Sequence, residues 1–163
     1  MSAQHILFLI VGLVTLGAAL AVVTSRNVLH SAFLLALSFF GVAVLYVLLD
    51  APYLAAAQVL VYIGAISILI VFAIMLSRKV AARDLVQRNG QWLVSAIVAV
   101  LMFGVLVYMT LQTAWPVVKQ ALGVDAIGGL GEAFVGAYAL PFEVVSIVLL
   151  VALVGAIIIA REK

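Results

Sequence analysis

Residues 54–76 read LAAAQVLVYIGAISILIVFAIML, a stretch that contains no charged side chain. A helix of roughly 20 apolar residues crosses the hydrocarbon core of a bilayer, which is about 30 Å thick. The stretch is therefore predicted to span a membrane as one helix. A plain anchor needs no polar groups at mid-depth, yet this segment carries Gln58, Tyr62, Gly64 and Ser67 near its centre. These four residues require an explanation of their own.

The composition of the whole chain is that of a membrane protein. Of 163 residues, 69% are hydrophobic and 9% are charged, with a mean hydropathy of +1.44, whereas soluble domains carry about 25% charged residues. Five apolar stretches are long enough to cross a bilayer: 5–24, 28–49, 54–76, 92–112 and 141–160. We predict an all-α, polytopic fold of five transmembrane helices in a single membrane domain, 1–163. An external connection of about residues 113–140 joins the last two spans.

The basic residues predict which way these helices cross the membrane. If the N-terminus is outside, one face receives almost all of the Lys and Arg residues: Arg26, Arg78, Lys79, Arg83, Arg88, Arg161 and Lys163. Lys119 falls on the other face. Because cytoplasmic loops carry the excess of basic residues, we expect the N-terminus outside (periplasmic) and the C-terminus inside (cytoplasmic). Lipid headgroups account for this basic face, so we predict no nucleic-acid partner.

The ionisable residues exclude several kinds of site. His5, His30, Asp50 and Glu143 all lie near the predicted interfaces, and none lies at mid-membrane. Carriers and pumps place such groups inside the membrane, so this chain alone is a poor proton channel. If it takes part in ion transport, neighbouring subunits must supply the carboxylates. His30 has no partner at metal-ligand spacing and the chain has no cysteine, so we expect no metal site.

Spacing divides the polar residues of the third span between two faces. Gln58 and Tyr62 are four residues apart and share one face of an α-helix, while Ala57, Gly64 and Ser67 project roughly to the opposite side. Small residues allow another helix to approach closely, so we expect protein to enclose this helix. Gly64 is also where the winding could change most easily, and a π-bulge there would rotate one side of the helix. Spacing alone favours the alternative, in which Tyr62 and Gly64 are ordinary packing residues.

Three more polar residues lie at the ends of predicted helices. Tyr46 and Asp50 are four apart on one face at the end of the second span, and we expect Asp50 to cap the third helix. Glu143 follows Pro141 at the start of the fifth span, where a carboxylate complements the helix dipole. For Asp50 and Glu143 a structural role is favoured over a proton site.

Several blocks of the sequence together resemble one known family. They are Asn27–Ala32, Leu45–Ala51, Gln58–Ile66, Phe72–Leu76, Leu140–Glu143 and Leu150–Ala156. The most specific of them is QVLVYIGAI at residues 58–66. The blocks are similar to the subunit J (chain 6) family of proton-pumping NADH:quinone oxidoreductase, respiratory complex I or NDH-1. The resemblance covers the second, third and fifth spans in sequence, and the other regions only in character.

The resemblance implies a non-catalytic subunit of a translocase that reduces ubiquinone or menaquinone with NADH in a bacterial inner (cytoplasmic) membrane. The complex as a whole would use FMN, iron–sulfur clusters, NADH and quinone, and this chain would bind none of them. The implied partners are lipids and other membrane-arm subunits. Those subunits are the small three-helix subunit of K type that bears carboxylates, the quinone-site subunit of H type, the subunit of A type and an antiporter-like subunit.

For the candidate site, the resemblance implies a gate. Tyr62 and Gly64 would form a π-bulge whose switch to regular winding opens or closes a water path toward carboxylates of the small neighbouring subunit. The supporting polar residues would be Gln58, Ser67, Tyr46, Asp50 and Glu143. No residue is expected to be catalytic. Two alternatives remain open: a purely structural and assembly subunit, or the equivalent subunit of a related cation/proton antiporter or membrane-bound hydrogenase.

Overall fold

The computed structural model describes residues 3–77, 90–114 and 126–161, and all regular structure in these ranges is helical. Five helices are long and apolar enough to cross a bilayer: Ala3–Thr24 (α1), Val28–Leu48 (α2), Pro52–Leu76 (α3, η1 and α4), Trp92–Gln112 (α5) and Ala139–Ala160 (α7). The predicted all-α fold with five helices of transmembrane length and hydropathy is confirmed for this part of the chain. Pro52 is the first residue of α3, where its missing N–H costs nothing.

Orientation and domain count stay predictions. Most of the basic residues on which the orientation depends lie outside the described residues: Arg78, Lys79, Arg83, Arg88, Lys119 and Lys163. The chain divides into two compact units, Met1–Thr113 and Ala114–Lys163, and each is described by itself below.

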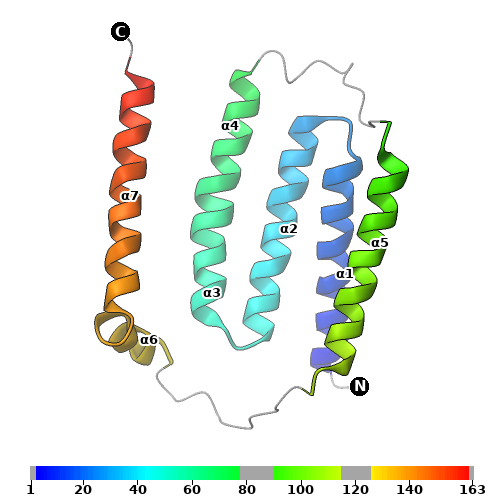
Figure 1. Ribbon diagram of the computed structural model, residues 1–163, viewed down its shortest axis with the longest axis horizontal. Coiled ribbons are helices and arrows are strands. Elements are labelled where there is room, and N and C mark those ends of the chain that lie inside the picture. The colour runs from blue at the N-terminus through cyan, green and yellow to red at the C-terminus, as the bar shows by residue number, and fades with distance from the viewer. Residues whose placement is uncertain (1–2, 78–89, 115–125, 162–163) are drawn as a thin grey trace. The chain divides into compact units, whose positions relative to one another are not determined.

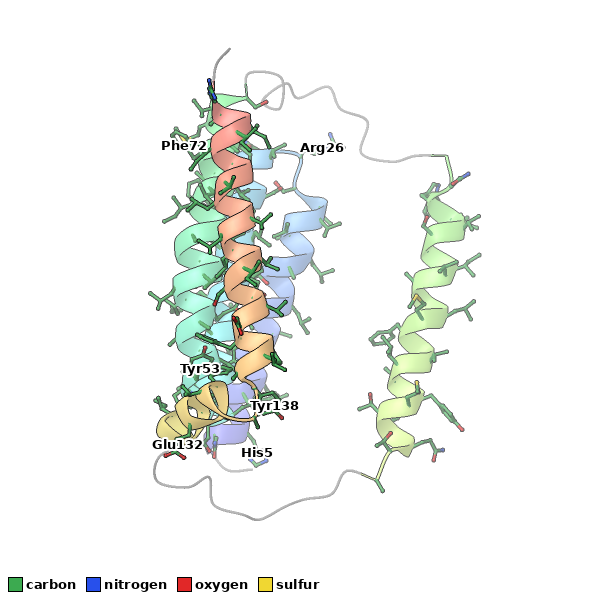
Figure 2. The ribbon with its side chains drawn as sticks, turned by 60° about the vertical axis from the view of Figure 1, so that its left-hand side comes forward. His5, Arg26, Tyr53, Phe72, Glu132 and Tyr138 are labelled. Carbon is green, nitrogen blue, oxygen red and sulfur yellow. The ribbon has the colours of Figure 1, made fainter. Side chains whose placement is uncertain are left out.

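The first unit is built around α2. This helix contacts α1 on one side and the third span, made of α3, η1 and α4, on the other, and it runs antiparallel to both (Figure 1). His5 and Tyr53 lie at one end of this group, whereas Arg26 and Phe72 lie at the other (Figure 2). The short α1–α2 and α2–α3 turns force this arrangement, because helices joined by a few residues become antiparallel neighbours.

The two turns are stabilised differently: the first by a side-chain cap and the second by a residue with left-handed backbone. At the α1–α2 turn, Asn27 caps α2 and its Oδ1 accepts hydrogen bonds from the N–H groups of Leu29 and His30, at 3.0 and 3.3 Å. At the α2–α3 turn, Asp50 has a left-handed backbone with φ 54°. The Ala51 N–H donates a 2.9 Å hydrogen bond to the Tyr46 carbonyl, five residues back. A 6→1 hydrogen bond of this kind closes the C-terminus of many helices.

The predicted role of Asp50 was therefore wrong. α3 has Ala51 at its N-cap position and receives no side-chain cap, so Asp50 terminates α2 instead of starting α3. A left-handed residue is needed where the chain leaves α2, and Asp tolerates that conformation better than most residues. α2 ends at Leu48, so Asp50 also lies beyond the helical face that carries Tyr46.

Small side chains make up the interior of the first unit. The buried residues are Thr15, Ala18, Ala32, Ser38, Gly41, Ala43, Ala55, Gln58 and Ser67. Small residues allow transmembrane backbones to approach closely, which replaces the hydrophobic driving force that lipid removes. Gly41 is the tightest point, because a Cβ built there would lie 3.0 Å from Thr15 Cβ and would collide with Thr15 Oγ1. By contrast, α5 has no buried residue.

The second unit contains α6 (Ala126–Val135) and α7. The rings of Phe134 and Phe142 stack with their centroids 5.8 Å apart, which joins the two helices. α7 begins at Ala139, so Glu143 is the fifth residue of the helix and the first turn has no acidic residue. The predicted dipole interaction of Glu143 was thus wrong, since that interaction fades beyond the first turn. The helix starts early because Pro141 is tolerated in a first turn.

We expect Gly41→Ala to destabilise the first unit, because the added methyl forces α1 away from α2. Overpacking of this kind costs about 1–3 kcal/mol. The thermal unfolding midpoint of the full chain in detergent, followed by circular dichroism, should fall. The matched control is Gly17→Ala on α1, where a Cβ meets nothing within 4 Å. Thr15→Ala should restore part of the loss. An unchanged midpoint for Gly41→Ala would contradict the tight α1–α2 contact.

Candidate functional site

The third span changes its winding in the middle. An α-helical turn and a half, Pro52–Ala57, leads into ten residues of π-helix, Gln58–Ser67, and α-helix resumes from Ile68 to Leu76. A π-helix bonds residues five apart instead of four, and such segments are rare and frequently occur at functional sites. The hydroxyl of Ser67 follows the same spacing, because it donates a 2.8 Å hydrogen bond to the carbonyl of Tyr62, five residues back.

The wider winding decides which residues face α2. In an α-helix, residues nine apart are separated by two and a half turns and lie on opposite faces. A π-helix has about 4.4 residues per turn, so nine residues make about two turns and return to the same face. Gln58 and Ser67 are nine apart, and both are buried, with 7% and 4% of their surface exposed. The prediction that Ser67 lies opposite Gln58 was wrong because it assumed α-helical spacing.

Two contacts join this π-helix to the middle of α2, and both involve Phe39. The side-chain amide of Gln58 donates to the Phe39 carbonyl at 3.5 Å, a long hydrogen bond. The ring of Tyr62 meets the ring of Phe39 edge to face, with centroids 5.4 Å apart and planes at 75°. Edge-to-face aromatic pairs contribute about 0.5–1.5 kcal/mol beyond their buried area. Gln58 and Tyr62 therefore share Phe39 as a neighbour.

Tyr62 keeps its polar end available. Its side chain is 45% exposed in this chain. The structure gives its hydroxyl no hydrogen-bond partner among residues 3–77, 90–114 and 126–161. The ring thus packs on Phe39 while the hydroxyl can bond to water or to a group on a neighbouring chain.

Gly64 lies on the exposed side of the π-helix, away from the buried Gln58 and Ser67. A Cβ built on it would meet one atom within 4 Å, the carbonyl oxygen of Val59, at 3.3 Å. That oxygen belongs to the residue five positions back, which π-winding brings close. A side chain at this position would therefore press on the wide turn itself, and glycine removes that pressure.

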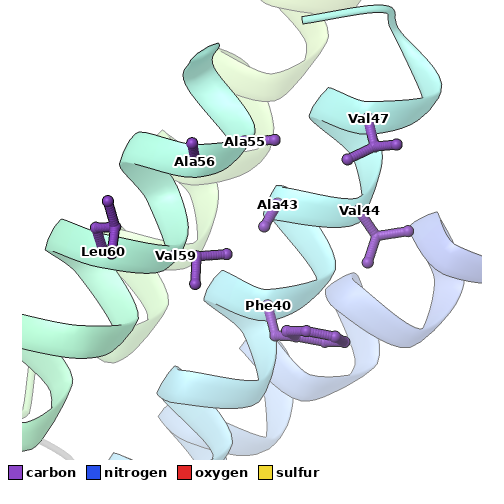
Figure 3. Close-up of a pocket in the computed structure, with 8 residues that line it drawn as sticks. All are labelled: Phe40, Ala43, Val44, Val47, Ala55, Ala56, Val59 and Leu60. Atoms are coloured by element: carbon purple, nitrogen blue, oxygen red, sulfur yellow. The ribbon is translucent and has the colours of Figure 1, made fainter. Parts of the chain in front are cut away.

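An apolar groove lies beside the first part of the π-helix. It has a volume of about 500 Å³ and separates α2 from α3 and η1 (Figure 3). Its lining consists of Phe40, Ala43, Val44, Val47, Ala55, Ala56, Val59 and Leu60. With no polar side chain in its wall, the groove can hold hydrocarbon or an apolar side chain, and it offers nothing to orient a polar substrate.

The chemistry available at this site is hydrogen bonding by an amide and two hydroxyls. Gln58, Tyr62 and Ser67 supply an amide and two hydroxyls, and no Asp, Glu, His, Lys or Arg belongs to η1. Among the described residues no cluster of three His, Asp or Glu side chains could hold a metal ion. Tyr46 belongs to α2, and Asp50 lies in the turn beyond it. Glu143 lies in the second unit.

Sequence reasoning missed Phe39, which contributes both contacts to the π-helix. Nothing in a single sequence distinguishes Phe39 from its neighbour Phe40, since both belong to the same apolar span. The pair of Thr15 and Gly41 was missed for the same reason. A glycine inside a span signals close approach, but not which helix approaches.

Comparison with known proteins identifies relatives of the chain. Residues 18–159 match the family described as NADH-ubiquinone/plastoquinone oxidoreductase chain 6. The NAD(P)H-quinone oxidoreductase chain 6 of Synechocystis sp. is 44% identical over 98% of this chain and 81% of its own length. That of Leptolyngbya boryana is 41% identical over the same shares. The NAD(P)H-quinone oxidoreductase subunit 6, chloroplastic, of Physcomitrium patens is 39% identical over 98% of this chain and 85% of its own length.

Thiol labelling should detect the winding, because the natural chain has no cysteine. We expect Ser67→Cys to react slowly with an apolar pyridyl disulfide, since position 67 is buried. Adding Gly64→Ala should favour α-winding, rotate position 67 away from α2 and speed the reaction. The control is Ser38→Cys, which is buried on α2 outside the π-helix and should not respond to Gly64→Ala. If Cys at position 67 reacted at the same rate with and without Gly64→Ala, the result would count against this description.

Proposed function

Because this chain belongs to the NADH-ubiquinone/plastoquinone oxidoreductase chain 6 family, we propose that it is a membrane subunit of a complex that couples quinone reduction to proton translocation. The observation that carries this proposal is the family match over residues 18–159, which includes all or part of every span. The donor would be NADH or NADPH, as the names of the relatives suggest for those proteins. The relatives reported above carry no antiporter or hydrogenase name, so we do not favour those alternatives.

In this proposal the redox cofactors belong to other subunits. Iron–sulfur clusters are held by cysteine thiolates, and this chain has no cysteine. The groove between α2 and the third span has an apolar lining, which offers no group for the phosphate of a flavin. The role of this chain would be non-catalytic and confined to the membrane.

The π-helix would act as a gate whose two states are π- and α-winding. Conversion to α-helix would move Ser67 from the face of Gln58 to the opposite face, because nine residues then make two and a half turns. The hydrogen bond from Ser67 to the Tyr62 carbonyl would break, and Tyr62 would rotate relative to Phe39. A rearrangement of this size can open or close a narrow file of water molecules beside the helix. It also supplies the bistable element that conformational coupling needs.

The proton-carrying groups would come from neighbouring subunits. η1 has polar side chains that can order water, among them the exposed Tyr62, but no carboxylate or imidazole that could carry a proton. Buried carboxylates are the usual carriers inside membranes. We therefore propose that Tyr62 faces a carboxylate-bearing partner, and that this partner is the small three-helix subunit. The quinone-site subunit, the subunit of A type and an antiporter-like subunit would complete the surroundings.

We propose an outside N-terminus, an inside C-terminus and a single membrane domain. The strong bias of Lys and Arg toward one set of loops supports this topology. The membrane would be the proton-tight membrane that houses the oxidoreductase. A bacterial inner membrane is one such membrane, and the chloroplastic relative carries the name of another compartment.

Substitutions at Gly64 should slow the assembled complex. Gly64→Ala adds a Cβ that lies 3.3 Å from the Val59 carbonyl oxygen in the π-wound state, a tight contact with the wide turn. The difference between Gly and Ala in helices, about 1 kcal/mol, sets the scale and corresponds to about a fivefold change in the ratio of the two windings. We expect quinone reduction and proton pumping to fall several-fold while the complex assembles normally, and Gly64→Val to have a larger effect.

The control for this experiment is Gly104→Ala on α5, where a Cβ meets nothing within 4 Å. This variant should keep full activity. A purely structural subunit predicts a different result, in which Gly64 variants either retain full activity or fail to assemble. Either outcome for Gly64→Ala would contradict the gate.

Reporter fusions should test the topology. With the N-terminus outside, green fluorescent protein fused after Lys163 should fluoresce, and alkaline phosphatase at the same position should be inactive. Insertion of alkaline phosphatase between the fourth and fifth spans should be active, because that connection would be external. The opposite pattern would overturn the orientation.

A further inference from the structure

The α1–α2 turn contains a recess that the proposed gate does not use. It has a volume of about 630 Å³ and is lined by Ser25, Arg26, Asn27, His30 and Leu34. Figure 2 shows Arg26 at one end of the helices of the first unit, the end at which α1 finishes and α2 begins. A membrane-spanning helix ends where the hydrocarbon meets the headgroups. The recess therefore lies at the depth of lipid headgroups.

Arg26 has no carboxylate partner within the described part of its unit. In residues 3–77 and 90–113 the one acidic residue is Asp50, which lies at the other end of α2. The Arg26 side chain is exposed and lines the recess. An arginine that has no carboxylate partner among the described residues of its unit is suited to bind an external anion, because its planar donor group binds phosphate through paired hydrogen bonds.

The neighbours of Arg26 can add hydrogen bonds from side chains. Asn27 Oδ1 already accepts the N–H groups of Leu29 and His30, so an anion here would be bound by side chains and not by the bare end of the helix. The Nδ2 group of Asn27 is left to donate, and the His30 ring carries an N–H in either protonation state.

The deeper wall of the recess is apolar. Leu34 lies one helical turn beyond His30 on α2 and is half-buried. The recess thus combines a basic side chain at headgroup depth with one aliphatic side chain, Leu34, further along α2. A phospholipid has the same order of parts, with a charged phosphate above acyl chains. A free phosphate would gain nothing from Leu34.

We propose that this recess is a binding site for an anionic phospholipid, with the headgroup phosphate held by Arg26, His30 and the Asn27 amide, and an acyl chain along Leu34. Bound lipid would hold the α1–α2 turn at its membrane depth. The inference requires only that the chain spans a membrane, so it stands or falls separately from the proposed oxidoreductase role.

A photoactivatable phosphatidylglycerol, with a diazirine near the glycerol end of its acyl chain, tests the site. The probe is added to the assembled membrane complex that contains the chain, and the labelled residues are identified by mass spectrometry. We expect labelling within residues 25–34 that unlabelled phosphatidylglycerol competes away. Phosphatidylcholine and inorganic phosphate at the same concentration should not compete.

Three variants make the result specific. Arg26→Gln should lower labelling of this segment about fivefold, the effect expected for one basic side chain near a membrane surface, and Arg26→Gln with His30→Gln should lower it further. Arg26→Lys should retain most of it. The matched control, Arg161→Gln at the end of α7, should leave it unchanged. Oxidoreductase activity is not needed for any of these readouts.

Several outcomes would overturn the proposal. Absence of labelling in residues 25–34 of the assembled complex would mean that another subunit covers Arg26. Competition by inorganic phosphate would indicate a phosphate site without lipid, and equal competition by phosphatidylcholine would show that the net negative charge does not matter. Equal labelling of natural chain and double variant would exclude Arg26 and His30 as the ligands.

Discussion

The arrangement of the third span depends on one geometric constraint: Gln58 and Ser67 must both face α2. In an α-helix these residues would point in opposite directions, and one of two polar side chains would face lipid or a neighbouring subunit instead of α2. The π-helix from Gln58 to Ser67 brings both to the buried face. The hydrogen bond of Ser67 to Tyr62 and the contact of Gln58 with Phe39 both follow from that alignment.

This constraint also explains why the site combines tight and loose contacts. Gln58 and Ser67 are buried, and the Tyr62 ring is held edge to face on Phe39, so the α2 side of the helix is well defined. The opposite side carries Gly64, exposed and without any side chain to resist rewinding. One side of this helix packs on α2, and the other side has no side chain at Gly64. Its winding can therefore change without disrupting the packing of α1 on α2. The proposed gate uses this difference.

The sequence predicted much of the fold and less of the site. The five spans follow from hydrophobicity, and each predicted end agrees with the structure to within two residues. The roles of residues near helix ends were less predictable: Asp50 closes α2 instead of capping α3, and Glu143 lies two residues deeper in α7 than expected. The first error arises because the left-handed backbone of Asp50 makes it the end of α2, and the second because α7 starts two residues before the predicted position.

By itself the sequence determined that the chain is a helical membrane protein, which residues lie in its spans, and that Gln58, Tyr62, Gly64 and Ser67 are the unusual features of the third one. These properties are local, since hydrophobicity and residue type are read along the chain. Only the tertiary structure decided that Ser67 joins Gln58 on the α2 face and that Phe39 is the shared neighbour. The winding of a helix and the residues it contacts depend on packing between helices. Residue spacing in the sequence, read with an assumed period of 3.6 residues per turn, cannot predict either of them.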